Sequence, residues 1–433
     1  MKIRNIDAFQ IFDSRGNPTV EAVVTLDSGV REQGLVPSGA STGRNEAQEL
    51  RDGDAARFRG RSVFRAIDNI RREIAPALVG WDVTDQVALD RRLIELDGTP
   101  NKSRLGANAV LGVSMAAARA AAAAQRKPLF DYLGNGTGTL LPLPEIQLFG
   151  GGRHANGCVD VQDFMIVATG ATTCEQTLEM TFNVFQAAGD LLKERGLLAG
   201  VADEGGYWPA FDRNETVFEA MIEAIRRAGY EPGRQVAVSL DIAASELYRD
   251  GQYRFGSEGR AFSSAAFAEL LASWVEKYPI LSIEDPMAEE DWEGWALARK
   301  LLGRRIQLVG DDLFTTNVER IRKGVELDVA NAVLIKLNQI GTVTETLGAI
   351  QATQRAGWLP IISARSGETE DAFIAHLAVA TNAGQLKVGS FCRSERMAKW
   401  NELLRIQREL GARAQFIGSR IYRRILAAPN GAV

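Results

Sequence analysis

The 433-residue chain has few of the residues that build disulfide frameworks or metal clusters. Its three cysteines, Cys158, Cys174 and Cys392, are too few and too scattered for either, so we expect a reducing, cytoplasmic location. Its two histidines, His154 and His376, exclude a histidine-rich metal cluster. No signal peptide is recognisable, because the first residues lead directly into an alternating strand pattern.

Long apolar runs and an excess of positive charge are missing too. No run is expected to span a bilayer, and the alanine-rich residues 115–124 include an arginine, which is typical of a helix in a soluble protein. The net charge of −5 and the pI near 5.5 argue against nucleic acid or an anionic membrane as the main partner. What remains is an ordinary globular composition, 45% hydrophobic and 24% charged, in a chain long enough for two domains.

The first part of the chain places strands before helices. Alternating apolar residues predict three strands, at residues 3–12, 19–26 and 31–36. Helical periodicity follows at residues 62–77, 84–96 and 107–125. This order is typical of an α+β domain, which we place at residues 1–138, before the leucine- and proline-rich residues 140–144.

From about residue 145 strands and helices alternate, and several apolar runs end in a charged residue. Asp241, Glu284 and Asp311 end three such runs, Lys336 ends a fourth, and Arg365 follows a fifth. The intervals of 43, 27, 25 and 29 residues each hold an amphipathic helical stretch. Alternation at this pitch predicts a parallel (β/α)8 barrel over residues 139–433, with its reactive groups at the carboxyl ends of the strands.

Three carboxylates that converge at one end of a barrel suit a hard divalent cation such as Mg²⁺. Lys336, on the next strand, is then placed to exchange a proton with a metal-bound substrate. One acid at a strand end is more often a helix N-cap or a surface ion pair than a ligand. Three acids in register with a lysine behind them favour the metal site, and the pattern therefore predicts an enzyme.

Eight segments spread along the whole chain form a set of recognisable motifs. They include Asp-Ser-Arg-Gly-Asn-Pro-Thr-Val-Glu at 13–21, Pro-Ser-Gly-Ala-Ser-Thr-Gly at 37–43, Asp-Glu-Gly-Gly at 203–206 and Ser-Ile-Glu-Asp-Pro at 282–286. The others are Gly-Asp-Asp-Leu at 310–313, Lys-Leu-Asn-Gln-Ile-Gly-Thr at 336–342, Arg-Ser-Gly-Glu-Thr-Glu-Asp at 365–371 and Cys-Arg-Ser-Glu-Arg at 392–396. Taken together and in order, these segments resemble the enolase superfamily. The resemblance implies an α/β fold, an enolase-type modified TIM barrel with an N-terminal α+β capping domain, assembled as a homodimer or larger homo-oligomer.

The resemblance also implies chemistry on 2-phosphoglycerate or phosphoenolpyruvate with two Mg²⁺ ions. Asp241, Glu284 and Asp311 would hold the first ion, and Ser41, on a loop that closes, would reach the second. The catalytic side chains would be Lys336, as a base whose pKa nearby cations lower, Lys387 against the substrate carboxylate, Glu204 as an acid, and His154 on a second closing loop. Arg365 and Ser366 would bind the phosphate. Taken alone, Ser41 could be a turn residue and Lys387 a solvated surface lysine.

The chain departs from the family pattern in and near this expected site. Ala364 replaces a histidine, Asp163 replaces the glutamate that partners Glu204, and Phe149, the three glycines after it and Arg153 replace the usual loop before His154. Tyr207 and Trp208 are bulkier than the usual residues after Glu204. Arg153 and Trp208 are candidates for an anion clamp and a stacking face in substrate binding.

These departures lead us to expect a diverged enolase homologue specialised as a carboxyphosphonoenolpyruvate synthase of phosphonate or phosphinate antibiotic biosynthesis. Such an enzyme would join an enolpyruvyl unit from a small phosphoester to a CMP-linked second substrate, CMP-activated phosphonoformate. One alternative is a phosphopyruvate hydratase, a carbon–oxygen lyase that converts 2-phosphoglycerate to phosphoenolpyruvate. Another is a non-catalytic scaffold with an enolase fold.

Overall fold

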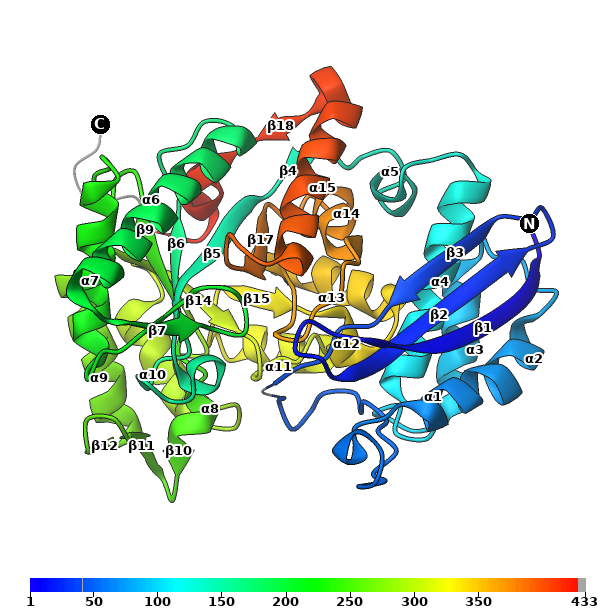
Figure 1. Cartoon of the computed structure of the whole chain (residues 1–433), viewed down its shortest axis with the longest axis horizontal. Helices are drawn as coiled ribbons and strands as arrows, with labels where there is room; N and C mark the ends of the chain where they lie inside the picture. Colours follow the sequence, from blue (N-terminus) through cyan, green and yellow to red (C-terminus); the bar gives the residue numbers. More distant parts are fainter. Residues whose placement is uncertain (41, 427–433) are drawn as a thin grey trace.

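The computed structural model describes residues 1–40 and 42–426. Ser41, a predicted metal and substrate ligand, therefore lies outside the described residues. Figure 1 shows a smaller N-terminal unit, coloured blue to cyan, beside a larger unit that contains the barrel.

The N-terminal unit begins with the predicted three-stranded meander. Strands β1 (Ile3–Phe12), β2 (Pro18–Leu26) and β3 (Arg31–Leu35) pair antiparallel in the order β1-β2-β3. The first turn is held by Asp13, whose Oδ1 accepts hydrogen bonds from the backbone N–H groups of Arg15 (2.9 Å) and Asn17 (2.8 Å). An aspartate that caps its own turn in this way fixes the register of the two strands.

Helices follow these strands, as the sequence predicts. The helix expected at residues 62–77 is divided into α1 (Phe64–Asn69), a π-helical turn η2 (Ile70–Ile74) and α2 (Ala75–Leu78). Next come α3 (Gln86–Asp97), α4 (Ala107–Ala124) and α5 (Leu129–Leu133). By length and composition α4 is the one described helix that could cross a membrane, but 83% of it is buried and it packs on β2 and β3 as a core helix.

Eight strands of the described chain close into a barrel. In chain order they are β5 (Leu143–Gly150), β6 (Asp163–Val167), β9 (Ala237–Asp241), β13 (Ile280–Glu284), β14 (Gln307–Gly310), β15 (Ala332–Ile335), β16 (Leu359–Ser363) and β17 (Gln385–Gly389). The pairing of β17 with β5 completes the ring. Nearly all of their residues are buried, because barrel strands are covered on both faces, and buried polar side chains such as Glu145, Ser239 and Gln307 stand among the apolar ones.

The predicted (β/α)8 barrel is present, but its second strand departs from the parallel arrangement. β6 runs antiparallel to both β5 and β9, and no α-helix separates it from β5. Antiparallel neighbours need no crossover helix, so the 151–162 connection can remain a loop at the carboxyl end of β5. Strands β7 (Leu198–Val201) and β8 (Tyr207–Pro209) extend the sheet beyond β5.

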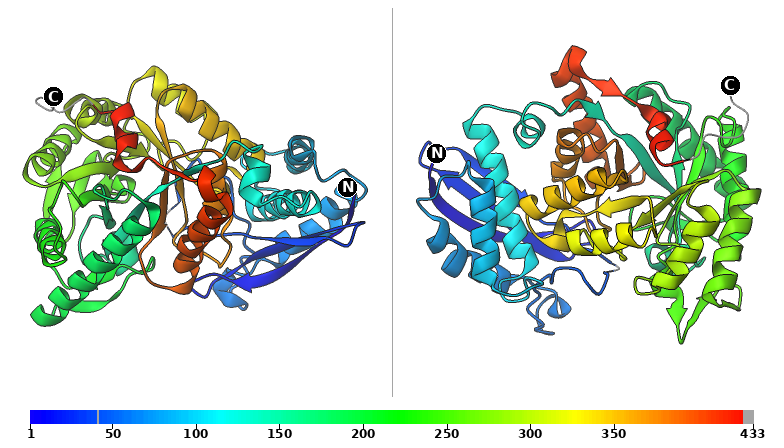
Figure 2. Two further views of the ribbon diagram at one scale, coloured as in Figure 1. Left: turned by 90° about the horizontal axis from the view of Figure 1, so that it is seen from above. Right: turned by 180° about the vertical axis from the view of Figure 1, so that it is seen from behind.

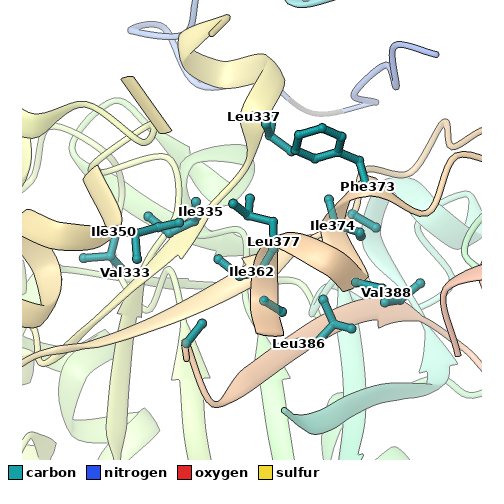
Figure 3. Close-up of a cluster of buried hydrophobic side chains, with 14 of the residues drawn as sticks. Val333, Ile335, Leu337, Ile350, Ile362, Phe373, Ile374, Leu377, Leu386 and Val388 are labelled. Atoms are coloured by element: carbon teal, nitrogen blue, oxygen red, sulfur yellow. The ribbon is translucent and has the colours of Figure 1, made fainter. Parts of the chain in front are cut away.

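Long helices surround the barrel, as Figure 2 shows. They are α6 (Cys174–Arg195), α7 (Asn214–Arg227), α9 (Ser264–Lys277), α10 (Trp292–Leu302), α11 (Val318–Glu326), α13 (Val343–Arg355), α14 (Phe373–Ala380) and α15 (Ser394–Leu410). Figure 3 shows a part of this packing, with Ile350 of α13 and Leu377 of α14 against Ile335 of β15 and Ile362 of β16. Burial of such side chains is the main free-energy gain of the fold.

Short elements complete the large unit. They are α8 (Ala244–Leu247), the small sheet of β10 (Tyr248–Arg249), β11 (Gln252–Phe255) and β12 (Arg260–Phe262), the turn α12 (Leu337–Ile340), and the pair β4 (Leu140–Leu141) and β18 (Gln415–Phe416).

The N-terminal unit contributes a segment to the carboxyl end of the barrel. Ser38 and Gly367 exchange backbone hydrogen bonds of 2.7 and 2.9 Å, and the N–H of Ala47 donates to the carbonyl of Gln339 (2.7 Å). Because Gly367 and Gln339 follow β16 and β15, residues from both units line the same end of the barrel.

Candidate active site

Three acids stand at the carboxyl ends of adjacent barrel strands. Asp241 ends β9, Glu284 ends β13, and Asp311 follows β14 directly. Asp241 and Glu284 are paired in register in the parallel ladder, so their side chains reach the same level of the barrel. All three side chains are buried, and the structure thus brings the predicted metal ligands together.

Two lysines lie among these acids. The Nζ of Lys387, on β17, donates to Glu284 Oε2 (2.7 Å) and Asp241 Oδ2 (2.9 Å). The Nζ of Lys336, next to the end of β15, donates to Asp311 Oδ2. Lys387 is buried, although taken alone it could have been a surface residue, and the side chain of Lys336 is 13% exposed. Burial would lower the pKa of Lys387, but Asp241 and Glu284 outweigh it and raise the pKa well above its usual value.

The same balance applies to Lys336, for which the resemblance implies a pKa lowered by bound cations. Among the protein's own side chains, the adjacent Asp311 carboxylate outweighs the opposing effect of burial and raises the pKa of Lys336. The lysine is held as a cation by an acid that the sequence assigns to a metal.

The two lysines do not neutralise the acid cluster completely. Burial and the neighbouring Asp241 raise the pKa of Glu284 well above its usual value. The Oε1 atom of Glu284 is buried without a hydrogen-bond partner among the described residues. A buried, unpaired carboxylate oxygen is costly, and carboxylates are the ligands that Mg²⁺ prefers. The donor set therefore fits a hard divalent cation.

A second group contains His154, Asp163 and Glu204. The Nδ1 of His154 lies 2.8 Å from Asp163 Oδ1, and its Nε2 lies 3.9 Å from Glu204 Oε1. Burial opposes the charged form of His154, but Asp163 and then Glu204 favour it, and its pKa is raised to about 9. The imidazole is therefore cationic at neutral pH. Asp163 also lies 3.9 Å from Lys387 Nζ, which links this group to the acids.

Arg365 and Ser366 follow β16 and face the N-terminal unit. The guanidinium of Arg365 pairs with Glu46 (Nη1–Oε2, 2.9 Å) and donates to Asn338 Oδ1 (2.8 Å). The hydroxyl of Ser366 accepts a hydrogen bond from the backbone N–H of Ala40 (2.8 Å). The predicted phosphate-binding residues thus lie at the site, and Arg365 already holds a carboxylate.

A cavity of about 20 Å³ lies at the centre of these groups. Its lining includes His154, Glu204, Lys336, Lys387 and Arg365, together with Ala364 and Ala40. Ala364 is buried, and its N–H donates to the carbonyl of Lys387 (2.9 Å).

The other two predicted substrate contacts lie outside the lining of this cavity. Arg153 points to Glu246 on α8 (2.9 Å) and to the carbonyl of Ala40 (3.2 Å). Trp208, on β8, is partly buried, pairs with Gly200 of β7 and lies close to the thiol of Cys158.

Four polar residues at the site were missed by the sequence analysis. Gln339 donates to Asp311 Oδ1 (2.7 Å), Gln162 donates to Asp241 Oδ2 (3.3 Å), and Asp285 accepts from the backbone N–H of Asp311 (2.9 Å). Gln339 and Asp285 lie in the family-like segments that contain Lys336 and Glu284, so their place in the sequence could have identified them as site residues. Glu46 follows the 37–43 loop without any pattern and is found only through its contact with Arg365.

Comparison with known proteins gives matches along nearly all of the chain. A family model described as "Enolase, N-terminal domain" matches residues 3–133, and one described as "Enolase, C-terminal TIM barrel domain" matches residues 138–425. A curated protein named Enolase 1, from Desulfitobacterium hafniense (strain Y51), is 54% identical over 418 residues. The match covers 96% of this chain and 95% of that protein.

Proposed function

The chain belongs to the enolase family of carbon–oxygen lyases, and we propose that it catalyses the reversible dehydration of 2-phosphoglycerate to phosphoenolpyruvate. The observation that carries the proposal is the 54% identity with Enolase 1 over 96% of the chain. It is supported by five charged side chains gathered at one end of the barrel, those of Asp241, Glu284, Asp311, Lys336 and Lys387.

The prediction of a specialised carboxyphosphonoenolpyruvate synthase is wrong. We based it on a few departures such as Ala364 and Asp163, whereas the similarity to a protein named as an enolase extends over 96% of the chain. The structure also gives the departures ordinary roles. Asp163 still holds His154 beside Glu204, and Trp208 lies outside the cavity lining, close to Cys158. Without that prediction, nothing calls for a CMP-linked second substrate.

We infer that Asp241, Glu284 and Asp311 hold the first of two Mg²⁺ ions. When bound, Mg²⁺ supplies concentrated positive charge beside the substrate carboxylate, which the carbon next to it needs as it loses a proton. The ammonium of Lys387, already between Asp241 and Glu284, would face the same carboxylate. Arg365 would exchange Glu46 for the substrate phosphate, since its planar fork suits both anions.

Lys336 would remove the proton from the carbon beside the carboxylate. Its present partner, Asp311, keeps it protonated. Lys336 would lose this partner when Asp311 holds a cation, and the amine would then be free to accept a proton. Across the cavity Glu204 would donate a proton to the departing hydroxide. The cationic His154, 3.9 Å from Glu204, would keep that acid correctly placed.

Conversion of 2-phosphoglycerate by the purified protein tests the proposal, with ³¹P NMR in the presence and absence of Mg²⁺ as the readout. We expect prompt formation of phosphoenolpyruvate with Mg²⁺, at a turnover of about 10 s⁻¹ or more, and none after chelation. Lys336→Ala should abolish the conversion, while Lys323→Ala, on the outer helix α11, should leave it unchanged. No conversion by the wild-type protein with Mg²⁺ would refute the proposal.

A cytoplasmic location, a homodimer or larger homo-oligomer, and the domain boundary at residues 138 and 139 stay predictions. A small phosphoester substrate follows from the proposed function.

A further inference from the structure

The catalytic cavity is too small for the substrate that the proposed function requires. Its volume of about 20 Å³ is close to the space that a single buried water needs. A phosphorylated three-carbon acid is many times larger than a water molecule, so part of the wall must move before it enters. This step rests on the proposed function.

Two segments from different parts of the chain contribute to that wall. We define the first cover segment as residues 37–40 and the second cover segment as residues 150–157. Ala40 of the first and His154 of the second both line the cavity. The first is held by the hydrogen bond from the N–H of Ala40 to Ser366 Oγ, and the second by that from the N–H of Asp203 to the carbonyl of His154 (3.1 Å).

Arg153 joins the two cover segments to each other. Its Nη1 donates to the carbonyl of Ala40 (3.2 Å), and this is the one hydrogen bond between the two segments among the described residues. Its Nη2 pairs with Glu246 of α8 (2.9 Å), which anchors the guanidinium beside the mouth of the barrel. A planar guanidinium can bind a carbonyl and a carboxylate at once, whereas a lysine ammonium has no such fixed fork.

We propose that Arg153 is a positioning residue that couples the two cover segments, so that they close over the substrate together, with Glu246 orienting its guanidinium. The side chain is 54% exposed, and an ion pair with such exposure contributes weakly. A weak contact suits this role, because the cover must open in every turnover.

Arg153→Ser tests this role. Loss of the bridge shifts the cover towards the open state, and the apparent affinity for substrate falls with the fraction of closed cover. We expect KM for 2-phosphoglycerate to rise about two- to fivefold, as for the loss of a weak exposed pair, with kcat within about twofold of wild type. Arg153→Lys should recover only part of the loss. The control Arg322→Ser removes an exposed Arg322–Glu319 pair on α11 and should change neither constant.

Glu246→Gln separates this role from direct substrate binding. If Arg153 positions the cover, Glu246→Gln raises KM as well, and the double variant is no worse than Arg153→Ser, because both act through one contact. If Arg153 instead binds the substrate phosphate, release from Glu246 leaves KM unchanged or lowers it, and the proposal is overturned.

Hydrogen–deuterium exchange of the ligand-free protein gives a readout that does not depend on activity. Arg153→Ser should speed exchange in peptides of both cover segments and at the amide of Asp203, which donates to the carbonyl of His154. Faster exchange in the second segment alone would overturn the coupling even if the enzyme is active. Faster exchange in both segments would support it even if 2-phosphoglycerate proves not to be the substrate.

Discussion

Glu145, a carboxyl group buried inside the barrel, gives a sharp test of the electrostatics of this structure. It lies on β5 and is almost completely inaccessible to solvent. Its nearest polar contacts are the hydroxyl of Ser239 (3.2 Å) and the amide of Gln307 (3.5 Å). It forms no salt bridge with any described residue, and burial raises its pKa from 4.5 to about 7.

The raised pKa of Glu145 determines how the free energy of unfolding depends on pH. Below pH 4.5 Glu145 is protonated in both the folded and the unfolded chain, so it carries no penalty. Between pH 4.5 and about 7 the unfolded chain loses the proton first, and the free energy of unfolding falls as pH rises. Above about pH 7 the penalty is complete. At about 1.4 kcal/mol per pH unit it amounts to about 3 kcal/mol.

Glu145→Gln removes the ionisation and keeps the shape of the side chain. The variant should be more stable than the wild type at pH 8. This difference in free energy of unfolding should be about 2 to 3 kcal/mol larger at pH 8 than at pH 5. Urea denaturation at the two pH values measures this difference. Glu326→Gln, at the exposed end of α11, is the control and should show no pH-dependent gain. Equal effects of Glu145→Gln at pH 5 and pH 8 would refute the reasoning.

Three further predictions concern the site and the thiols. Asp163→Asn removes the nearest carboxylate from His154, so the pKa of His154, about 9 in the wild type, should fall by more than one pH unit. NMR titration of the imidazole measures this, and an unchanged pKa would mean that Asp163 does not stabilise the imidazolium. Asp311→Asn removes one of the three acids and should weaken Mg²⁺ binding at least tenfold by titration calorimetry, and wild-type affinity in this variant would exclude Asp311 as a ligand. Cys174 is buried, and burial raises the pKa of its thiol to about 12. A thiol reagent at pH 7 should therefore label at most two of the three cysteines until the protein is unfolded. Three fast-reacting thiols in the folded protein would contradict the packing of α6.

The overall fold was accessible from the sequence because its signals are local and periodic. The meander of β1 to β3 follows from apolar spacing, with ends close to those predicted, and helices lie in the intervals where amphipathic stretches were expected. The acids at the ends of β9, β13 and β14 could be placed together because parallel strands bring their carboxyl ends to one edge. The antiparallel β6 could not be predicted, because an apolar run of five residues does not record its direction.

Composition and order of residues determined that this chain is an α/β enzyme with an acidic, lysine-containing centre at one end of a barrel. Only the tertiary structure decided how those charges are balanced. Lys336 has a raised pKa because Asp311 is adjacent, Arg365 is held by Glu46 from the other unit, and Arg153 meets a carbonyl of a distant loop. A pKa or an ion pair depends on burial and on distances between residues far apart in the chain, and a sequence pattern contains neither quantity.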